Sequence, residues 1–338
     1  MIEYLDIINF MPFQELHIDK LKRVNLIAGK NNVGKTALLD AVKVVLVEDS
    51  IALDETPIFI YLLKTRNLFN EENKYSKDLY DSLIHRKSLS VDGELRINSL
   101  LLRKGDPYFE GKIDPPFTIK QSKRWYKHEV ASVMGDWKAD FLLQNRHNLT
   151  SYFDEFIEVS FSSNPDFHTI SRLWSPLVLT PREDDVLAIL REAIEPNLVR
   201  FAIDRSTIKV RLKDTEKPVP IETLGDGVRR ILLIALGLAN AQGKALLIDE
   251  IELGLHHSVM EKIWKIIFKY AVAWDIQVFA TTHSQDAIRT FHYVASQEKY
   301  TDEAEFIRLQ MGRIGKHEAI IYDGDRLKDS LNLELEIR

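Results

Sequence analysis

The chain has 338 residues and a formal net charge of −6, because 45 lysines and arginines face 51 aspartates and glutamates. Its 45% hydrophobic and 28% charged residues are typical of a globular protein, and the negative charge argues against global attraction to nucleic acid while leaving room for a local basic patch. Since cysteine is absent from the sequence, disulfides and thiolate metal sites are excluded and a reducing compartment is indicated.

No stretch of the sequence suits a membrane. The longest nearly apolar run, residues 231–241, is too short to span a bilayer. The N-terminus carries Glu3 and Asp6 and lacks the layout of a signal peptide. We therefore expect a cytoplasmic protein with no membrane partner.

Three strands, a glycine loop and a helix are predicted at the start of the chain. The strands are expected over residues 2–10, 13–18 and 23–28, and the helix over 34–47. The loop between them, Gly29-Lys30-Asn31-Asn32-Val33-Gly34-Lys35-Thr36, fits the phosphate-binding pattern G-x-x-x-x-G-K-[ST]. This order places a helix N-terminus at the phosphates, where the helix dipole favours an anion.

The residue types in this loop suit a nucleoside triphosphate. Gly29 and Gly34 allow backbone conformations that turn successive N–H groups toward phosphate oxygens. Lys35 brings a cation to the β- and γ-phosphates, and the Thr36 hydroxyl can bind Mg²⁺. The predicted phosphate-binding set is Gly29, Asn31, Asn32, Gly34, Lys35, Thr36 and Ala37.

The segment from 51 to 179 is less regular and is interpreted as an insertion, a helical and β lid or arm between the core parts 1–50 and 180–338. Several prolines punctuate it. Its own elements are expected to be a charged helix and two strands, over 64–85, 94–102 and 156–161.

Within the insertion, positive charge alternates with aromatic side chains. This mixture suits single-stranded nucleic acid or a phosphate backbone, although a solvated charged face with anchoring aromatics has the same composition. The residues are Lys120, Lys123, Arg124, Trp125, Tyr126, Lys127 and His128.

A hairpin and a second glycine turn follow the insertion. Residues 198–203 and 207–212 are predicted to pair. The turn Leu224-Gly225-Asp226-Gly227-Val228-Arg229-Arg230 then leads into an apolar helix over 231–239. As in the first loop, a glycine turn comes directly before a helix N-terminus, although a plain turn before a core helix would have a similar sequence.

Two further predicted strands end in residues with catalytic chemistry. The buried strand within 244–250 ends in Asp249 and Glu250, of which one can hold the Mg²⁺ shell and the other can orient or deprotonate water. The strand 276–281 leads to His283, whose ring could contact the γ-phosphate, although a lone histidine is more often structural. Two closing strands and a short helix are expected over 305–309, 318–322 and 326–331.

Together these motifs resemble the ABC-type ATPases, in the soluble branch that includes SMC, RecF and OLD-like proteins, and they are most similar to bacterial AAA-type ATPases grouped with the OLD family. The resemblance implies a P-loop NTPase fold with a mixed sheet flanked by helices and an inserted α/β arm. Its motifs are Ile8-Asn9-Phe10 with Phe13, the loop 29–36, the turn 224–230, Asp249-Glu250-Ile251-Glu252 with Gly254-Leu255-His256, and Thr281-Thr282-His283-Ser284.

The resemblance also implies residue roles. Lys35 and Thr36 would bind phosphates and Mg²⁺, with Asp249 supporting the metal. Glu250 would be the general base, and His283 would be the switch histidine. The turn with Gly225, Asp226, Gly227 and Arg229 would reach the nucleotide of a second, head-to-tail copy, so that the ATPase works as a homodimer or a higher homo-oligomer.

Two positions depart from the family pattern. Gly225 replaces the usual signature serine, so Arg229 or backbone N–H groups would supply the donor in trans. Residues 79–86 stand where a glutamine loop is expected and do not provide one. The chain is also too short for the Toprim domain of OLD nucleases, so we expect any nuclease activity in another polypeptide.

These observations favour an Mg²⁺-dependent ATPase that regulates a separate effector, a nuclease or a toxin, in bacterial defence against phage. Two alternatives remain open at this point. The chain could hold ATP as a sensor or scaffold with negligible turnover, or it could be a DNA-repair clamp that uses the basic and aromatic residues of 120–128.

Overall fold

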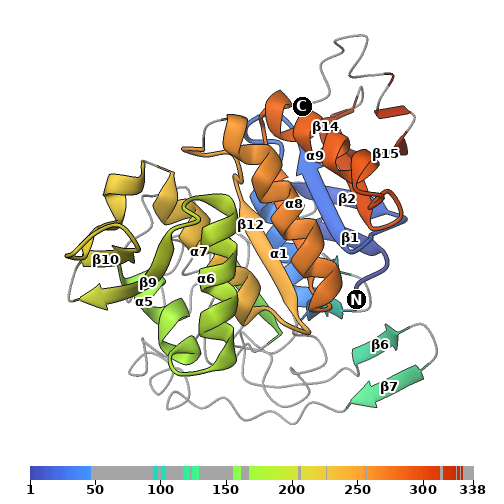
Figure 1. Cartoon of the computed structure of the whole chain (residues 1–338). Coiled ribbons are helices and arrows are strands. Elements are labelled where there is room, and N and C mark those ends of the chain that lie inside the picture. Colours follow the sequence, from blue (N-terminus) through green and yellow to red (C-terminus); the bar gives the residue numbers. More distant parts are fainter. Residues whose placement is uncertain are drawn as a thin grey trace.

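The computed structural model describes most of the chain outside its middle (Figure 1). The described ranges are 1–46, 94–97, 100–103, 117–121, 124–128, 155–160, 167–204, 207–225, 227–255, 257–312, 315–324, 326–327 and 329.

The central sheet has six strands in the order β15-β14-β3-β13-β12-β8. Neighbours from β14 to β8 pair in parallel, and β15 pairs antiparallel with β14 at one edge. The expected mixed sheet is thereby confirmed. Its strands are β3 (Val24–Ala28), β8 (Phe156–Ser160), β12 (Ala245–Asp249), β13 (Gln277–Thr282), β14 (Ala304–Met311) and β15 (His317–Tyr322).

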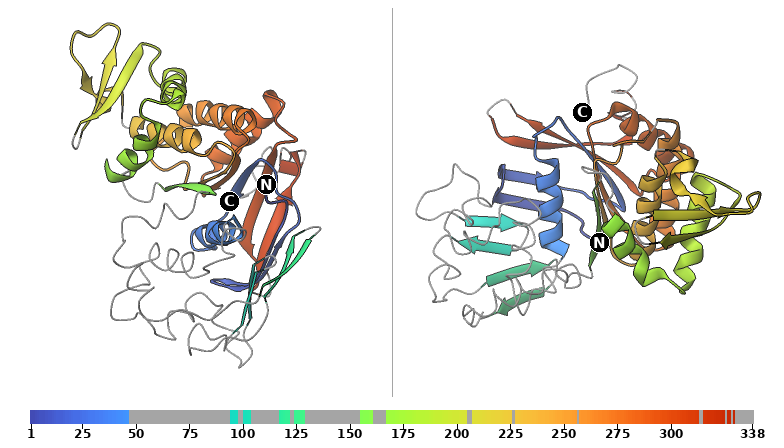
Figure 2. Two further views of the ribbon diagram at one scale, coloured as in Figure 1. Left: turned by 90° about the horizontal axis from the view of Figure 1, so that it is seen from below. Right: turned by 90° about the vertical axis from the view of Figure 1, so that its left-hand side faces the viewer.

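Helices cover both faces of this sheet. Among the described helices, α1 lies on one side and the others lie on the opposite side, as the two views of Figure 2 show. The helices are α1 (Lys35–Leu46), α5 (Phe167–Trp174), α6 (Pro181–Ala193), α7 (Val228–Asn240), α8 (His257–Ala273) and α9 (Gln285–Gln297).

Side chains that alternate along the strands build a separate core on each face. In β3, Leu26 packs with the α7–α9 side, and the next residue, Ile27, packs with α1. Leu246 and Leu247 of β12 divide in the same way. Because successive strand side chains point to opposite faces, a strand buried on both sides is mainly apolar, which explains the sequences VNLIA and ALLID. The one polar residue inside VNLIA, Asn25, is buried and donates to the carbonyl oxygens of Lys22 and Val278.

Three smaller sheets complete the described part. One has the order β2-β1-β4-β5, a second has the order β11-β10-β9, and β6 pairs with β7. The strands are β1 (Leu5–Phe10), β2 (Phe13–Ile18), β4 (Glu94–Ile97), β5 (Leu100–Arg103), β6 (Phe117–Gln121), β7 (Arg124–His128), β9 (Leu198–Asp204), β10 (Thr207–Leu212) and β11 (Val219–Pro220).

The structure differs from the sequence prediction at the borders of the insertion. β8 was expected inside the insertion 51–179, but it pairs along its length with β12 and is therefore the edge strand of the core sheet. The core thus resumes by residue 155 and not at 180, because a strand that completes the main sheet is held by its ladder of hydrogen bonds. The expected single strand over 94–102 is a hairpin of β4 and β5, and β4 adds to β1.

The remaining predictions for the middle of the chain stay untested. The expected helix over 64–85 and the missing glutamine loop at 79–86 lie outside the described residues. For the basic and aromatic residues the structure describes a β6–β7 hairpin, but not their side chains. Among the described helices, none combines the length and the apolar character that a bilayer crossing requires.

Candidate nucleotide-binding site

The phosphate loop lies between the end of β3 and the start of α1, as the glycine pattern predicted. Gly34 has a φ of 98°, and a Cβ atom at this position would come within 2.8 Å of the Phe13 ring. A side chain is therefore excluded both by the backbone conformation and by the neighbouring strand. Asn32 is also left-handed, with a φ of 63°. The loop N–H groups precede the first turn of α1, the arrangement that binds anions.

Lys35 is folded back onto this loop. Its side chain is 8% exposed, and Nζ donates hydrogen bonds to the carbonyl oxygens of Gly29 at 2.7 Å and Lys30 at 3.0 Å. Burial lowers the pKa of the amine, while the nearby carboxylates, Glu252 first among them, act in the opposite direction. The amine is thus hydrogen-bonded within the loop, and phosphate oxygens of a bound nucleotide can replace the two carbonyl acceptors.

Asp249 receives hydroxyl donors from two other elements. Thr36 at the start of α1 donates to Oδ2 at 3.1 Å, and Thr281 at the end of β13 donates to Oδ1. One carboxylate and one hydroxyl beside a phosphate loop match the way Mg²⁺ is bound in nucleotide sites, through few protein ligands together with phosphates and water. Asp249 and Thr36 therefore fit the predicted metal role.

Glu250 directly follows the buried strand β12 and takes a left-handed backbone conformation, with a φ of 55°. Its backbone N–H donates to the Thr281 hydroxyl at 2.8 Å, and the N–H of Ile251 donates to the carbonyl oxygen of Thr281. The strand end is thus held by its neighbour β13. A non-glycine residue with positive φ costs conformational energy, and such positions concentrate at functional sites.

His283 follows β13 at the same edge of the sheet. Its backbone N–H donates to Oε1 of Glu252 at 2.8 Å, and its ring atom Nδ1 lies 2.9 Å from that oxygen without the alignment of a hydrogen bond. Glu252, His283 and the first turn of α9 line a pocket of about 510 Å³. The Thr36–Asp249 hydrogen bond and the parallel pairing of β12 with β13 place the start of α1 beside the ends of both strands.

Two residues of this site had no predicted role. Thr281 holds Asp249 and the backbone of Glu250, and Glu252 contacts His283. The sequence shows Thr281 as a hydroxyl residue at the end of a predicted buried strand. This end lies beside Asp249 once β12 and β13 pair in parallel. Glu252 belongs to the motif Asp249-Glu250-Ile251-Glu252 of the family resemblance, but a carboxylate in a turn after a strand does not indicate its partner.

The second glycine turn precedes α7 and is open beside Gly225 but not beside Gly227, where a Cβ would lie 3.3 Å from Leu255. Gly225 has a φ of 117°, and no atom of the described residues lies within 4 Å of the position that its Cβ would take. Arg229 in the first turn of α7 donates to Glu222 of the same chain from Nε at 2.7 Å and from a terminal nitrogen. Asp226 lies outside the described residues. The role of Gly225, Gly227 and Arg229 at a second copy's nucleotide stays a prediction.

Comparisons with known proteins agree with this geometry. The family model described as "AAA domain, putative AbiEii toxin, Type IV TA system" matches residues 24–289, a range that includes all the groups above. An "ATP/GTP phosphatase" of Helicobacter pylori is 24% identical over 347 residues, covering 92% of each chain. An uncharacterized protein of Methanocaldococcus jannaschii is 34% identical over 203 residues, covering 57% of this chain and 86% of that protein.

Solved structures are similar to this chain in fold. An SMC head bound to the C-terminal winged-helix domain of ScpA has a TM-score of 0.56 at 13% identity, covering 98% of this chain and 99% of that one. An SMC head with an extended coiled coil, bound to a ScpA domain derived from Pyrococcus furiosus, has a TM-score of 0.53 at 12% identity, covering 98% of both chains. The ABC-ATPase-like P-loop fold is thereby confirmed. Since the family model spans most of the chain and the site contains the groups expected of it, the chain belongs to this AAA-domain family of P-loop ATPases.

Proposed function

We propose that the protein binds MgATP at the loop 29–37 and hydrolyses it in a head-to-tail dimer that regulates a separate effector. One observation carries the enzymatic part: an amine and two adjacent carboxylates converge at one edge of the sheet. Lys35, Asp249 and Glu250 come from two different elements, and Thr36 and Thr281 fix the Asp249 carboxylate. A fixed constellation of this kind suits phosphoryl transfer, in which positioning and charge stabilisation supply most of the catalysis.

Each residue has a distinct chemical task in this proposal. The Lys35 amine leaves the carbonyl oxygens of Gly29 and Lys30 and donates to phosphate oxygens. The carboxylate of Glu250 accepts a proton from the attacking water. Thr36 and Asp249 would hold a bound Mg²⁺, which would supply charge neutralisation on the phosphates. The ring of His283 is available to the terminal phosphate.

The dimer is supported by the open second glycine turn. Gly225 and Gly227 stand before the N-terminus of α7, and the space beside Gly225 is not filled by the described residues of its own chain. A backbone turn of this type can receive a phosphate of a nucleotide bound by another copy. Bound ATP would then favour the closed pair, because it contacts both copies only in that state.

The regulatory part rests on the comparisons. The family description names a putative toxin of a "Type IV TA system", and the similar SMC heads are each bound to a ScpA domain. These names support a partner protein, and we propose an effector of the nuclease or toxin class acting in defence against phage. The closer placement beside the OLD-like ATPases, and a contact with nucleic acid, stay predictions.

The first test is hydrolysis by a Lys35→Ala variant. We expect kcat/KM for MgATP to fall by about 100-fold or more, since a charged donor to the phosphates is removed. Release of phosphate is measured with ATP and with GTP for the wild type, for Lys35→Ala and for Lys316→Ala. Lys316 is the control, because it is an exposed lysine that lies 3.7 Å from Glu15. Equal hydrolysis by the wild type and Lys35→Ala would refute the assignment of this loop.

A further inference from the structure

Glu252 connects two parts of the site that the enzymatic proposal uses separately. Its side chain is 11% exposed, and Oε1 accepts the backbone N–H of His283. The ring atom Nδ1 of His283 lies 2.9 Å from that same oxygen, in a contact that lacks the alignment of a hydrogen bond. The second oxygen, Oε2, is buried and has no hydrogen-bond partner among the described residues. A buried carboxylate is thus placed against one edge of the imidazole ring.

Glu252 is not the N-cap of the neighbouring helix, although its Oε1 accepts the backbone N–H of His283. The helix α9 that follows His283 has its own N-cap, since the Ser284 hydroxyl accepts the N–H of Ala287. The turn containing Glu252 is also closed by its backbone, with N–H donors from Leu253 and Leu255 bound to carbonyl oxygens of Glu250 and Glu252. Burying a carboxylate costs free energy, and neither feature explains why one is present.

A carboxylate beside one imidazole nitrogen has a defined chemical effect. It favours the proton on that nitrogen, because N–H donation to a charged acceptor is stronger than the contact of two acceptors. The other nitrogen is then the one left for a ligand. In His283 the favoured site of the proton is Nδ1, and Nε2 is left for the nucleotide.

We propose that Glu252 is a positioning residue for His283: its carboxylate keeps the proton on Nδ1 and orients the ring so that Nε2 serves the terminal phosphate. This inference rests on the proposed function. In this role Glu252, in the turn after β12, acts only through His283 and not directly on ATP.

A double-mutant cycle tests this dependence. Glu252→Ala is expected to lower kcat by about 10-fold or more with nucleotide affinity changed by less than about threefold, whereas Glu252→Gln, which keeps an acceptor oxygen, loses less. In a His283→Ala background the further change on adding Glu252→Ala is expected to stay below about twofold. Glu261→Gln is the control, because Glu261 is an exposed carboxylate of α8 that pairs with Lys265 and does not line this pocket. Effects of Glu252→Ala and His283→Ala that multiply would overturn the proposal.

The tautomer of His283 gives a readout that does not depend on turnover. Protein labelled with ¹⁵N-histidine is measured by NMR, and the His283 signals are assigned by their absence in His283→Gln. We expect a protonated Nδ1 in the wild type and loss of this preference in Glu252→Ala. A proton on Nε2 alone in the wild type would refute the positioning role even if ATP is hydrolysed. The expected tautomer in a protein that hydrolyses no ATP would instead refute the proposed function and leave the role of Glu252 intact.

Discussion

Glu250→Gln is expected to lower kcat for MgATP by about 100- to 10,000-fold, the range that a general base contributes, while MgATP still binds. The substitution removes the proton acceptor without changing the side-chain volume. The backbone N–H of residue 250 can still donate to the Thr281 hydroxyl, so the strand end keeps its shape. The measurements are single-turnover hydrolysis and the affinity for a fluorescent ATP analogue.

Glu261→Gln is the control for this variant, since Glu261 lies on the outer side of α8 in an exposed pair with Lys265. We expect its kcat to equal that of the wild type. If the wild type and Glu250→Gln bind ATP equally and neither hydrolyses it, the protein is an ATP-dependent scaffold and the enzymatic proposal is wrong.

Lys43→Met is expected to lower the free energy of unfolding by about 3–5 kcal/mol, the cost of breaking a buried ion pair by removing one partner. Lys43 in α1 and Asp40 one turn earlier are each 1% exposed, with Nζ at 2.9 Å from Oδ1. The same amine lies 2.5 Å from Oε1 of Glu158 in β8. This triad joins the helix after the phosphate loop to the edge strand of the sheet. Urea unfolding followed by circular dichroism measures the loss.

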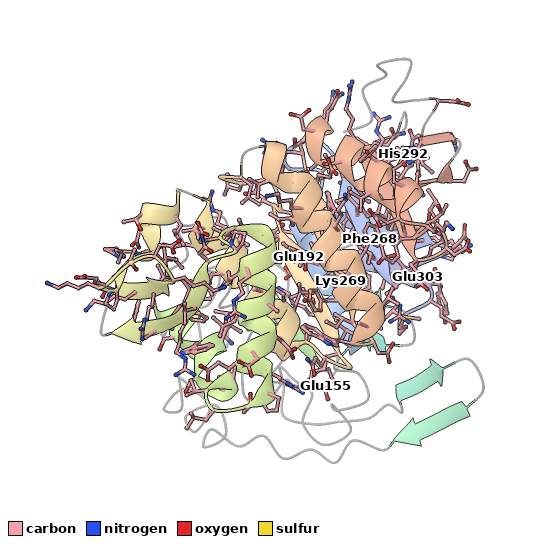
Figure 3. The ribbon with its side chains drawn as sticks, viewed as in Figure 1. Glu155, Glu192, Phe268, Lys269, His292 and Glu303 are labelled. Atoms are coloured by element: carbon pink, nitrogen blue, oxygen red, sulfur yellow. The ribbon has the colours of Figure 1, made fainter. Side chains whose placement is uncertain are left out.

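A matched pair on the surface gives the control. Lys269 of α8 and Glu192 of α6 point toward each other from neighbouring helices (Figure 3), and both side chains are about half exposed, at 52% and 44%. Because water screens this pair, Lys269→Met is expected to cost less than about 1 kcal/mol. Equal losses for Lys43→Met and Lys269→Met would contradict the buried triad. Adding Asp40→Asn to Lys43→Met is expected to recover part of the stability, since one of the two carboxylates is then neutral.

The triad also has a pH dependence with a definite sign. Burial alone would lower the pKa of the Lys43 amine, but the carboxylates of Glu158 and Asp40 outweigh it and raise the pKa in the folded state. The folded-state pKa of Lys43 lies above the unfolded value of about 10.4. The charged amine therefore stabilises the fold in full below pH of about 10.4, and this stabilisation is lost as the pH rises through the folded pKa. The difference between wild type and Lys43→Met is therefore expected to be constant between about pH 7 and about pH 10, where Asp40 and Glu158 stay charged, and to decrease above it.

Patterns that are local in the sequence predicted most of the core. The glycine loop, the buried strands 24–28, 245–249 and 277–282, and the strand ends at Asp249 and His283 all lie where the sequence placed them, to within one residue. Each of these follows from a short motif whose residues are neighbours in the chain. A buried parallel strand needs an apolar run on both faces, and such a run can be read without knowledge of its partners.

Features that depend on distant partners could not be predicted. The strand β8 belongs to the central sheet because it pairs with β12, about 90 residues later, and its sequence FIEVS does not indicate that partner. In the sequence Lys43 is indistinguishable from a surface lysine, but in the structure its side chain is buried against Glu158. The sequence places Glu252 in a turn, and its contact with His283 exists only because β13 lies beside β12.

Sedimentation of Glu250→Gln with and without MgATP tests the central claim most directly, because this variant retains bound ATP and so holds the pair closed. The account predicts a monomer without nucleotide and a dimer with saturating MgATP. It also predicts that a second substitution, Lys35→Ala, abolishes the dimer. A Glu250→Gln protein that binds MgATP at the loop 29–37 and sediments as a monomer at every concentration would contradict it.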